Sequence, residues 1–227
     1  MKKVLLYSGG MDSWLIDKIW KPDIKLFFHI HTKSNEIEFE RVKEIKDVEV
    51  VEMDLARFEQ VENNYFMPLR NLHFLIYGAH YGNVLCIGSI GGSVHKDNDE
   101  NFKSMTENVI NYLLSEKPGY ESVQIEMPFV NKSKTNLLSE YIKLGGDIEE
   151  AYKETFSCYE PLGNKECHCC TSCLSKFTAF YNNGYNFSNE DIRVFIDSVK
   201  GQQPRCEQDV IDLYHFLRGG YNDQQTG

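Results

Sequence analysis

The sequence has no long apolar run. No segment approaches the length of about eighteen apolar residues that predicts a membrane-spanning helix. The apolar residues 4–7 are followed at once by Ser8-Gly9-Gly10, so this run is too short to be the apolar part of a secretory signal. We therefore expect a cytoplasmic protein that makes no contact with a membrane, in which residues 4–7 form a buried first strand.

Positive charge is also scarce. Lys and Arg together number 24 against 34 Asp and Glu, which gives a formal net charge of −10. This balance argues against the extended basic surface of a dedicated nucleic-acid binder, so no stable nucleic-acid binding is expected. With 41% hydrophobic and 26% charged residues, the chain can build a core. Its 227 residues suit one globular domain with a small appendage.

Short apolar runs alternate with helical patterns in the first part of the chain. The runs lie at residues 4–7, 25–30, 48–53, 84–87 and 123–127, and the helical patterns at residues 14–20, 36–45, 71–81 and 101–114. This alternation predicts an α/β fold in which a parallel five-stranded sheet carries helices on both faces. We assign this α/β domain to residues 1–150.

The second part of the chain reads as helical. The helical patterns lie at residues 133–144, 174–181, 189–199 and 207–217, with a cysteine-rich loop at 157–173 and a polar tail at 219–227 that we expect to be frayed. We assign residues 151–227 to a helical region stapled by a metal ion.

A glycine loop follows the first strand, with the sequence Ser8-Gly9-Gly10-Met11-Asp12-Ser13. Glycines let the backbone approach an anion, and the next helix points its N–H groups at it. The two serines add donors, and Asp12 is suited to hold Mg²⁺ at the phosphates. The alternative is an ordinary turn in which Asp12 or Ser13 caps the helix. The Gly-Lys-Ser/Thr of a Walker loop is absent.

Five of the seven cysteines lie within residues 158–173. In a reducing compartment, this cluster favours a metal site over disulfides. Cys158, Cys167, Cys170 and Cys173 are the candidate ligands of a structural zinc ion, and His168 and Cys169 could compete with them. An iron–sulfur cluster and a redox pair that includes Cys169 are the alternatives.

The glycine loop resembles the signature of the PP-loop ATP pyrophosphatases, which have an adenine nucleotide alpha hydrolase-like fold. The two motifs together are similar to the 7-cyano-7-deazaguanine synthases, the QueC family. The similarity extends to Met-Pro-Leu-Arg-Asn at residues 67–71, to the stretch 128–145, and to Thr-Phe-Ser-Cys-Tyr at 155–159 with the cysteines that follow. It covers most of the chain, to about residue 181.

The resemblance implies a ligase that uses ATP to adenylate 7-carboxy-7-deazaguanine and converts it with ammonia to 7-cyano-7-deazaguanine. Residues 8–13 would then bind ATP, with Asp12 and Ser13 in catalytic positions. Arg70 would stabilise charge on the phosphates or on the substrate carboxylate. Lys132 and Lys134 either contact phosphate or belong to a solvated helix start, and Asn71 would either bind a base edge or cap its helix.

Two segments differ from the family pattern. Phe-His-Ile-His-Thr-Lys at residues 28–33 replaces a Gly-Gln-Arg-His-like stretch, so His31 is either a substrate ligand or an exposed loop residue. In the stretch 91–102, Asp97 falls on the family's aspartate and is a candidate substrate ligand, but Asp99 takes the place of its arginine. Replacing a cation by an anion reverses the preference for a bound carboxylate.

These differences keep other functions open. The chain could pass an activated deazaguanine acid to another amine, even one on a protein. It could also thiolate or amidate RNA, or sense a nucleotide without turnover. The resemblance further suggests a homodimer, for which Phe195, Tyr214 and Phe216 are either interface or core residues.

Overall fold

The computed structural model describes residues 1–60, 67–91, 96–163, 165–200 and 208–224. They form two compact units, Met1–Ser133 and Lys134–Gly227, which we describe separately. The division falls earlier than the boundary near residue 150 that we drew from the sequence. The reason is that the helix α5 (Lys134–Lys143) packs against α7 (Thr171–Asn182) of the second unit.

The first unit contains a sheet of five parallel strands in the order β3-β2-β1-β4-β5, which confirms the predicted fold class. The strands are β1 (Lys3–Leu6), β2 (Ile24–His29), β3 (Val48–Glu52), β4 (Val84–Ile87) and β5 (Gln124–Glu126). The central strand β1 after Lys3 and its neighbour β4 are apolar because both faces of the sheet are covered.

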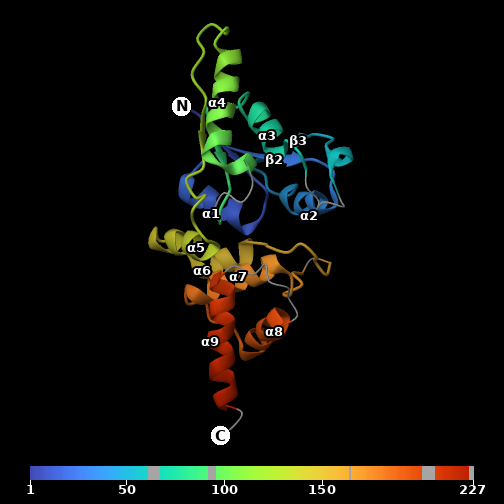
Figure 1. The fold of residues 1–227 in the computed structure, drawn as a ribbon, viewed down its shortest axis with the longest axis vertical. Helices are drawn as coiled ribbons and strands as arrows, with labels where there is room; N and C mark the ends of the chain where they lie inside the picture. Colours follow the sequence, from blue (N-terminus) through green and yellow to red (C-terminus); the bar gives the residue numbers. More distant parts are fainter. Residues whose placement is uncertain (61–66, 92–95, 164, 201–207, 225–227) are drawn as a thin grey trace. The chain divides into compact units, whose positions relative to one another are not determined.

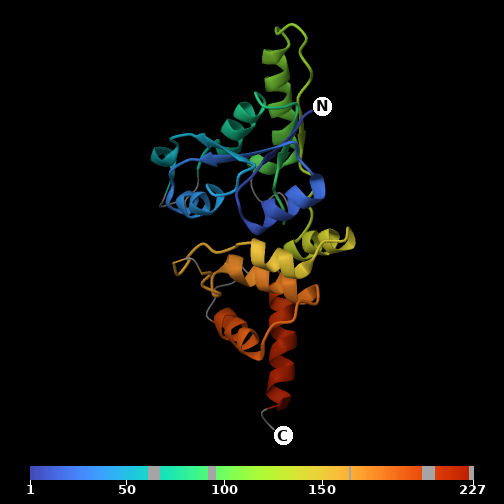
Figure 2. The same cartoon turned by 180° about the vertical axis from the view of Figure 1, so that it is seen from behind.

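Helices cover both faces of this sheet, as the views from front and back show (Figure 1, Figure 2). One face carries α1 (Met11–Trp20) and α2 (Lys33–Val42), and the other carries α3 (Arg70–Gly78) and α4 (Glu100–Leu114). Successive side chains of β2 point to opposite faces of the sheet. Phe27 stacks on Phe39 of α2 with ring centroids 6.2 Å apart, and Phe28 stacks on Phe74 of α3 at 4.3 Å.

The strand order creates a switch point between β1 and β4. The chain leaves β1 towards β2 on one side and leaves β4 towards β5 on the other. In an open parallel sheet, ligands bind beyond the carboxyl ends of the strands at such a point. The loops that begin after Leu6 and Ile87 are therefore the expected walls of a ligand site.

Side-chain caps fix two of the helices that border these loops. Thr32 caps α2 by accepting a hydrogen bond from the backbone N–H of Asn35. Asp99 caps α4 in the same way, through the N–H of Phe102. Two short 3₁₀ helices, η1 (Ala56–Phe58) and η3 (Lys96–Asn98), complete the described part of this unit.

The second unit is helical, as predicted. Its helices are α5, α6 (Ile148–Glu154), α7, α8 (Asn189–Lys200) and α9 (Gln208–Gln224). Helix α6, which was not expected from the sequence, is short, and Asp147 caps it through the N–H of Glu149. Helix α9 continues to Gln224, beyond the predicted end at 217 and into the tail that we expected to be frayed. Glu207 and residues 225–227 lie outside the described residues.

A separate apolar core holds α7, α8 and α9 together. Its buried members are Leu174, Phe195, Ile196, Val210, Leu213 and Leu217. Phe195 is therefore a core residue, Tyr214 is partly buried against the same cluster, and Phe216 is exposed. In the part of the chain that the structure describes, no helix combines the length and the apolar character needed to cross a membrane.

Candidate functional site

The glycine loop connects β1 to α1 at the switch point of the sheet. Gly10 is the N-cap of α1, and in this described segment no side chain caps that helix. Ser13 is buried, and its hydroxyl donates to the carbonyl of Gly10 at 3.0 Å, while its Oγ lies 3.2 Å from Oγ of Ser8. The alternative that Asp12 or Ser13 caps helix α1 in an ordinary turn is therefore wrong. The first turn of α1 instead presents its dipole to the loop, which suits an anion.

Gly9 occupies a position that no other residue suits. Its φ of +76° is in the left-handed region, and a Cβ built there would lie 2.5 Å from Cγ2 of Val42 on α2. Val42 is buried, and Met11 after the loop is buried as well. The loop is thus held between the sheet and α2, so its shape is set before any ligand arrives.

Helix α2 also brings a carboxyl group to this region. The carbonyl of Glu38 lies 3.9 Å from the Cβ position built at Gly9. Desolvation raises the pKa of Glu38 to about 7, against the opposing effects of a hydrogen bond from Asn35 and of the Arg70 charge. Arg70 is the first residue of α3 and is exposed. The structure therefore sets Arg70 near a partly buried carboxyl whose pKa lies close to neutral.

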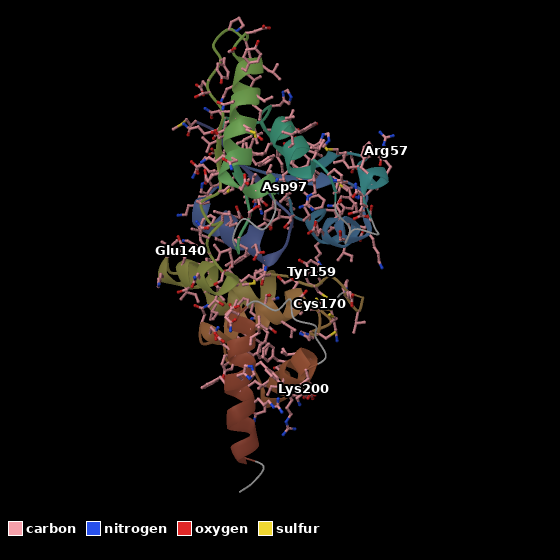
Figure 3. All side chains as sticks on the ribbon, in the orientation of Figure 1. Arg57, Asp97, Glu140, Tyr159, Cys170 and Lys200 are labelled. Carbon is pink, nitrogen blue, oxygen red and sulfur yellow. The ribbon has the colours of Figure 1, made fainter. Side chains whose placement is uncertain are left out.

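Asn71 and Asp97 come together, although the sequence separates them. The side-chain amide of Asn71 donates to the backbone carbonyl of Asp97 at 3.1 Å. Figure 3 labels Asp97 on η3, the short helix that precedes α4. The alternative that Asn71 caps α3 is wrong, because Leu69 is the N-cap, in a left-handed conformation. Asn71 instead fixes the loop after β4.

Asp99 has a structural role that the sequence analysis missed. Its carboxylate accepts from the N–H of Phe102 at 2.7 Å as the cap of α4. A carboxylate at this place is stabilised by the helix N-terminus, which explains an acidic residue here without reference to a ligand. Residues 92–95 of the same stretch lie outside the described residues.

His31 is not an isolated loop residue. Its ring lies 4.0 Å from the ring of His29, and both rings contact the carboxylates of Glu36 and Glu52. Hydrogen bonds to Glu52 and Glu36 raise the pKa of the buried His29, although burial itself acts to lower it. The His31 ring thus belongs to a polar cluster at the carboxyl ends of β2 and β3.

Of the two candidate lysines, one lies in each unit. Lys132 is the penultimate residue of the first unit. Its carbonyl accepts from the N–H of Gly91 at 2.8 Å, and its ammonium lies 5.3 Å from the ring centroid of Phe129. Lys134 is the first residue of α5 in the second unit. Their contacts with phosphate remain a prediction.

The four candidate metal ligands converge in the second unit. The ligand atoms of Cys158, Cys167, Cys170 and Cys173 all lie within 4.8 Å of one another. Sγ of Cys173 is 3.9 Å from that of Cys167 and 3.5 Å from that of Cys170. A tetrahedral site with Zn–S bonds of about 2.3 Å requires a separation of about 3.8 Å. The group can therefore hold a metal ion such as zinc.

Local structure favours a thiolate at Cys170, whereas the hydrogen bond with Cys170 and burial raise the pKa of Cys173, and burial raises that of Cys158. The backbone N–H of Cys167 points at Sγ of Cys158, and the N–H of Cys170 at Sγ of Cys167. Cys170 is the N-cap of α7, where Figure 3 labels it, and its contact with Cys173 lowers the pKa of Cys170 to about 4. Cys169 is exposed, and neither it nor His168 belongs to the described group of ligands.

A buried ion pair supports the cysteine loop. Nζ of Lys176 on α7 lies 3.0 Å from the carboxylate of Glu166, and it also donates to the carbonyl of Thr155. The other oxygen of Glu166 accepts from the N–H of Ser157, next to Cys158. Both charged side chains are almost fully buried. The pair therefore connects both ends of the loop to the helix that carries Cys173.

Sequence reasoning missed Glu38, His29, Glu36 and Glu52 as members of polar clusters. Glu38 sits three residues after Asn35 on one face of a helix, a spacing that any exposed helix also shows. His29 and Glu52 are partners in the register of β2 and β3, which only the sheet reveals.

Comparisons with known proteins agree with this arrangement. A family model described as "Queuosine biosynthesis protein QueC" matches residues 42–184, more than half of the chain. The chain is 27% identical over 224 residues to the 7-cyano-7-deazaguanine synthase of Rickettsia akari (strain Hartford), covering 80% of this chain and 95% of the relative.

Two other curated proteins of the same name are similar to the chain. The one from Sulfurihydrogenibium sp. (strain YO3AOP1) is 28% identical over 208 residues, covering 74% of this chain and 90% of the relative. The one from Archaeoglobus fulgidus is 26% identical over 218 residues, covering 81% and 87%. The family match includes the four clustered cysteines and begins after the glycine loop.

Proposed function

Because the chain belongs to the QueC family of queuosine biosynthesis proteins, we propose that it is an ATP-dependent ligase acting on 7-carboxy-7-deazaguanine. With ammonia, it would form 7-cyano-7-deazaguanine, the product named in its curated relatives. The observation that carries the ATP part of this proposal is Gly9, whose left-handed backbone and close approach to Val42 shape a loop at the start of α1.

The reaction proceeds in two activations. A carboxylate oxygen attacks the α-phosphorus of ATP, pyrophosphate leaves, and ammonia then displaces AMP from the carbonyl carbon to give the amide. The amide oxygen attacks a second ATP in the same way, and loss of a second AMP with two protons leaves the nitrile. The residues of this chain need to bind two nucleotides in turn, neutralise the departing phosphates and accept protons.

The loop and its neighbours supply these functions. Residues 8–13 with the N-terminus of α1 hold the phosphates, and Asp12 is the residue suited to Mg²⁺, which would neutralise phosphate charge when bound. Arg70 is assigned to the developing negative charge. Asn71, Asp97 and His31 are assigned to the deazaguanine.

Glu38 is suited to proton transfer. Its pKa of about 7 lets it accept a proton from attacking ammonia and release the proton again at neutral pH. The neighbouring charge of Arg70 keeps that pKa from rising further. Glu38 thus enters the proposal from the structure alone.

We assign zinc to the four cysteines as a structural ion. Cys158, Cys167, Cys170 and Cys173 provide a closed set of four ligands, which leaves no coordination position for a substrate. The zinc ion would stabilise the conformation of the loop that precedes α7.

Incubation with ATP and 7-carboxy-7-deazaguanine, with and without ammonium, tests the proposal. Mass spectrometry should detect amide and nitrile only with ammonium, together with AMP and pyrophosphate. Asp12→Asn should abolish AMP formation, whereas Asp197→Asn, an exposed change on α8, should leave the rate unchanged. ADP as the nucleotide product, or no turnover of this acid, would refute the proposal.

Two further results of this incubation would distinguish other acceptors of the activated acid from ammonia. If AMP forms with the acid while ammonium yields no amide, other amines, including protein lysines, become the acceptors to test. If AMP forms only with tRNA and not with the free acid, the chain modifies RNA and the proposed substrate is wrong.

A further inference from the structure

A second group of potential metal ligands lies in the first unit, at the carboxyl ends of β2 and β3. His29, His31 and Glu52 each offer a ligand atom, and these atoms lie within 4.8 Å of one another. The proposed reaction uses only His31 of these three residues, and it uses neither His29 nor Glu52. The cluster is separate from the cysteines, which belong to the other unit.

Three atoms of this group face one another. Oε2 of Glu52 lies 3.0 Å from Nδ1 of His29 and 3.0 Å from Nε2 of His31. In a tetrahedral site with bonds of about 2.0–2.1 Å, ligand atoms are separated by about 3.3–3.4 Å. The separations from Glu52 to the two ring nitrogens are only a few tenths of an ångström shorter, so a small widening of the group would admit the ion.

A fourth side chain, that of Glu36, contacts the second ring nitrogen of each histidine. Oε1 of Glu36 lies 3.0 Å from Nε2 of His29 and 3.4 Å from Nδ1 of His31. Metal-binding histidines commonly donate their other ring N–H to a carboxylate, which fixes the tautomer and strengthens the ligand. Glu36 stands in that outer position for both histidines at once.

The backbone around the group is fixed. His29 and Glu52 are partners in the parallel register of β2 and β3, so their side chains share one face of the sheet. The side chain of Asn35 accepts from the N–H of Ile30 at 2.6 Å and donates to the carbonyl of Phe28 at 3.1 Å. This clamp holds the strand end on both sides of His29.

Packing and exposure complete the site. The ring of His29 stacks on Phe39 with centroids 3.9 Å apart, and its side chain is only 7% exposed. His31 and Glu52 are 41% and 62% exposed. Two imidazoles and one carboxylate suit a divalent transition metal ion better than Mg²⁺ or Ca²⁺, which prefer oxygen. The solvent side leaves room for a fourth ligand such as water.

We propose that His29, His31 and Glu52 bind a divalent transition metal ion, with Glu36 as the carboxylate that orients both histidines. The chain then carries two metal sites of different chemistry: a closed thiolate site and an open histidine–carboxylate site. This proposal stands whether or not the chain has the catalytic activity proposed above, since it rests only on the residues at the ends of β2 and β3.

The metal content of the purified full chain tests it. Protein saturated with Zn²⁺ and freed of excess ion by gel filtration should contain two equivalents by elemental mass spectrometry. His31→Gln and Glu52→Gln should each contain one, whereas His73→Gln, an exposed change on α3, should contain two. Titration with Co²⁺ should give one ion with thiolate charge-transfer absorption and a second ion without it.

Either of two outcomes would overturn the proposal. The first is a wild-type chain that takes up only one equivalent of Zn²⁺ and one of Co²⁺ at saturation. The second is a second ion that both variants retain, which would place it elsewhere. Circular dichroism of His31→Gln and Glu52→Gln checks that each is folded, and both side chains are exposed enough for the substitutions to be tolerated.

Discussion

The conformation of the glycine loop at residues 8–13 depends more on Gly9 than on Ser8 or Ser13. Replacement of Gly9 by alanine adds a Cβ at a φ of +76°, 2.5 Å from Cγ2 of Val42. Left-handed backbone costs about 1–2 kcal/mol for a residue with a Cβ, and overpacking adds about 1–3 kcal/mol. Because Val42 is short and buried, the loop must move, and ATP binding is lost with its shape.

The matched comparison is Gly119→Ala. Gly119 has a φ of +72° but no atom within 4 Å of the added Cβ, so it reports the backbone cost alone. We expect Gly9→Ala to lower the free energy of urea unfolding by about 2–5 kcal/mol and Gly119→Ala by about 1–2 kcal/mol. Calorimetric titration with ATP should show weaker binding only for Gly9→Ala. Equal effects of both changes on stability and on ATP affinity would contradict this role.

Glu38 gives the site a pH dependence. Its pKa rises from 4.5 to about 7 in the folded chain, so the folded state holds the proton more tightly. The stability it contributes is present below pH 4.5 and is lost as the pH rises through 7. The stability of Glu38→Gln relative to wild type should therefore increase as the pH is raised from 5 to 8. Since one unit of pKa shift corresponds to about 1.4 kcal/mol, the increase is at most about 3 kcal/mol.

Urea unfolding at a series of pH values measures this difference. Glu40→Gln, an exposed change on the same helix, controls for the loss of a carboxylate in general. If the stability difference between Glu38→Gln and wild type stays constant across this range, Glu38 does not titrate near neutrality.

At the scale of elements, α2 organises the first unit's candidate site. Val42 touches the glycine loop, Glu38 meets the charge of Arg70, and Glu36 joins the two histidines. The sequence showed α2 only as a charged amphipathic helix, because its three contacts are made with segments distant along the chain. The strands, in contrast, were predictable because their apolar runs report burial directly.

The caps of α3 and α4 and the helix α6 could not be predicted from the sequence. Asn71 and Asp99 have the residue types of both ligands and caps, and only the geometry shows that Leu69 and Asp99 are the caps while Asn71 reaches Asp97. Helix α6 was missed because it is short and its stability comes from packing more than from propensity.

Helix α7 provides the test at this scale. Lys176→Met removes the partner of Glu166 and leaves a carboxylate buried, at an expected cost of about 3–5 kcal/mol. The exposed change Lys153→Met on α6 should have little effect. The double variant Lys176→Met/Glu166→Gln should recover part of the loss in thermal unfolding. A Lys176→Met chain as stable as wild type would show that the pair does not support the cysteine loop.

At the scale of the whole molecule, the two units differ in what holds them together. The first is built on a sheet with helices on both faces, whereas the second is helical and contains the group of four cysteines. Both motifs were predictable, since the glycine loop and the cysteine spacing are local in sequence. The division after Ser133 was not, because it depends on which helices α5 touches.

Metal removal should therefore affect the units unequally. After treatment with a chelator, hydrogen exchange should rise in the loop 155–170 and in α7, while β1 and β4 stay protected. Cys173→Ser should reproduce the effect, and Cys169→Ser should not, because Cys169 is outside the group of ligands. Unchanged exchange at α7 after complete loss of zinc would show that the ion does not stabilise this unit.

Oxygen transfer tests the central claim of adenylation most directly. 7-Carboxy-7-deazaguanine labelled with ¹⁸O in both carboxylate oxygens is incubated with the chain, ATP and ammonium, and the AMP is analysed by mass spectrometry. The account predicts two AMP for each nitrile, each with one ¹⁸O, because each carboxylate oxygen leaves on an α-phosphate. Unlabelled AMP, or label found in inorganic phosphate with ADP as the other product, would contradict it.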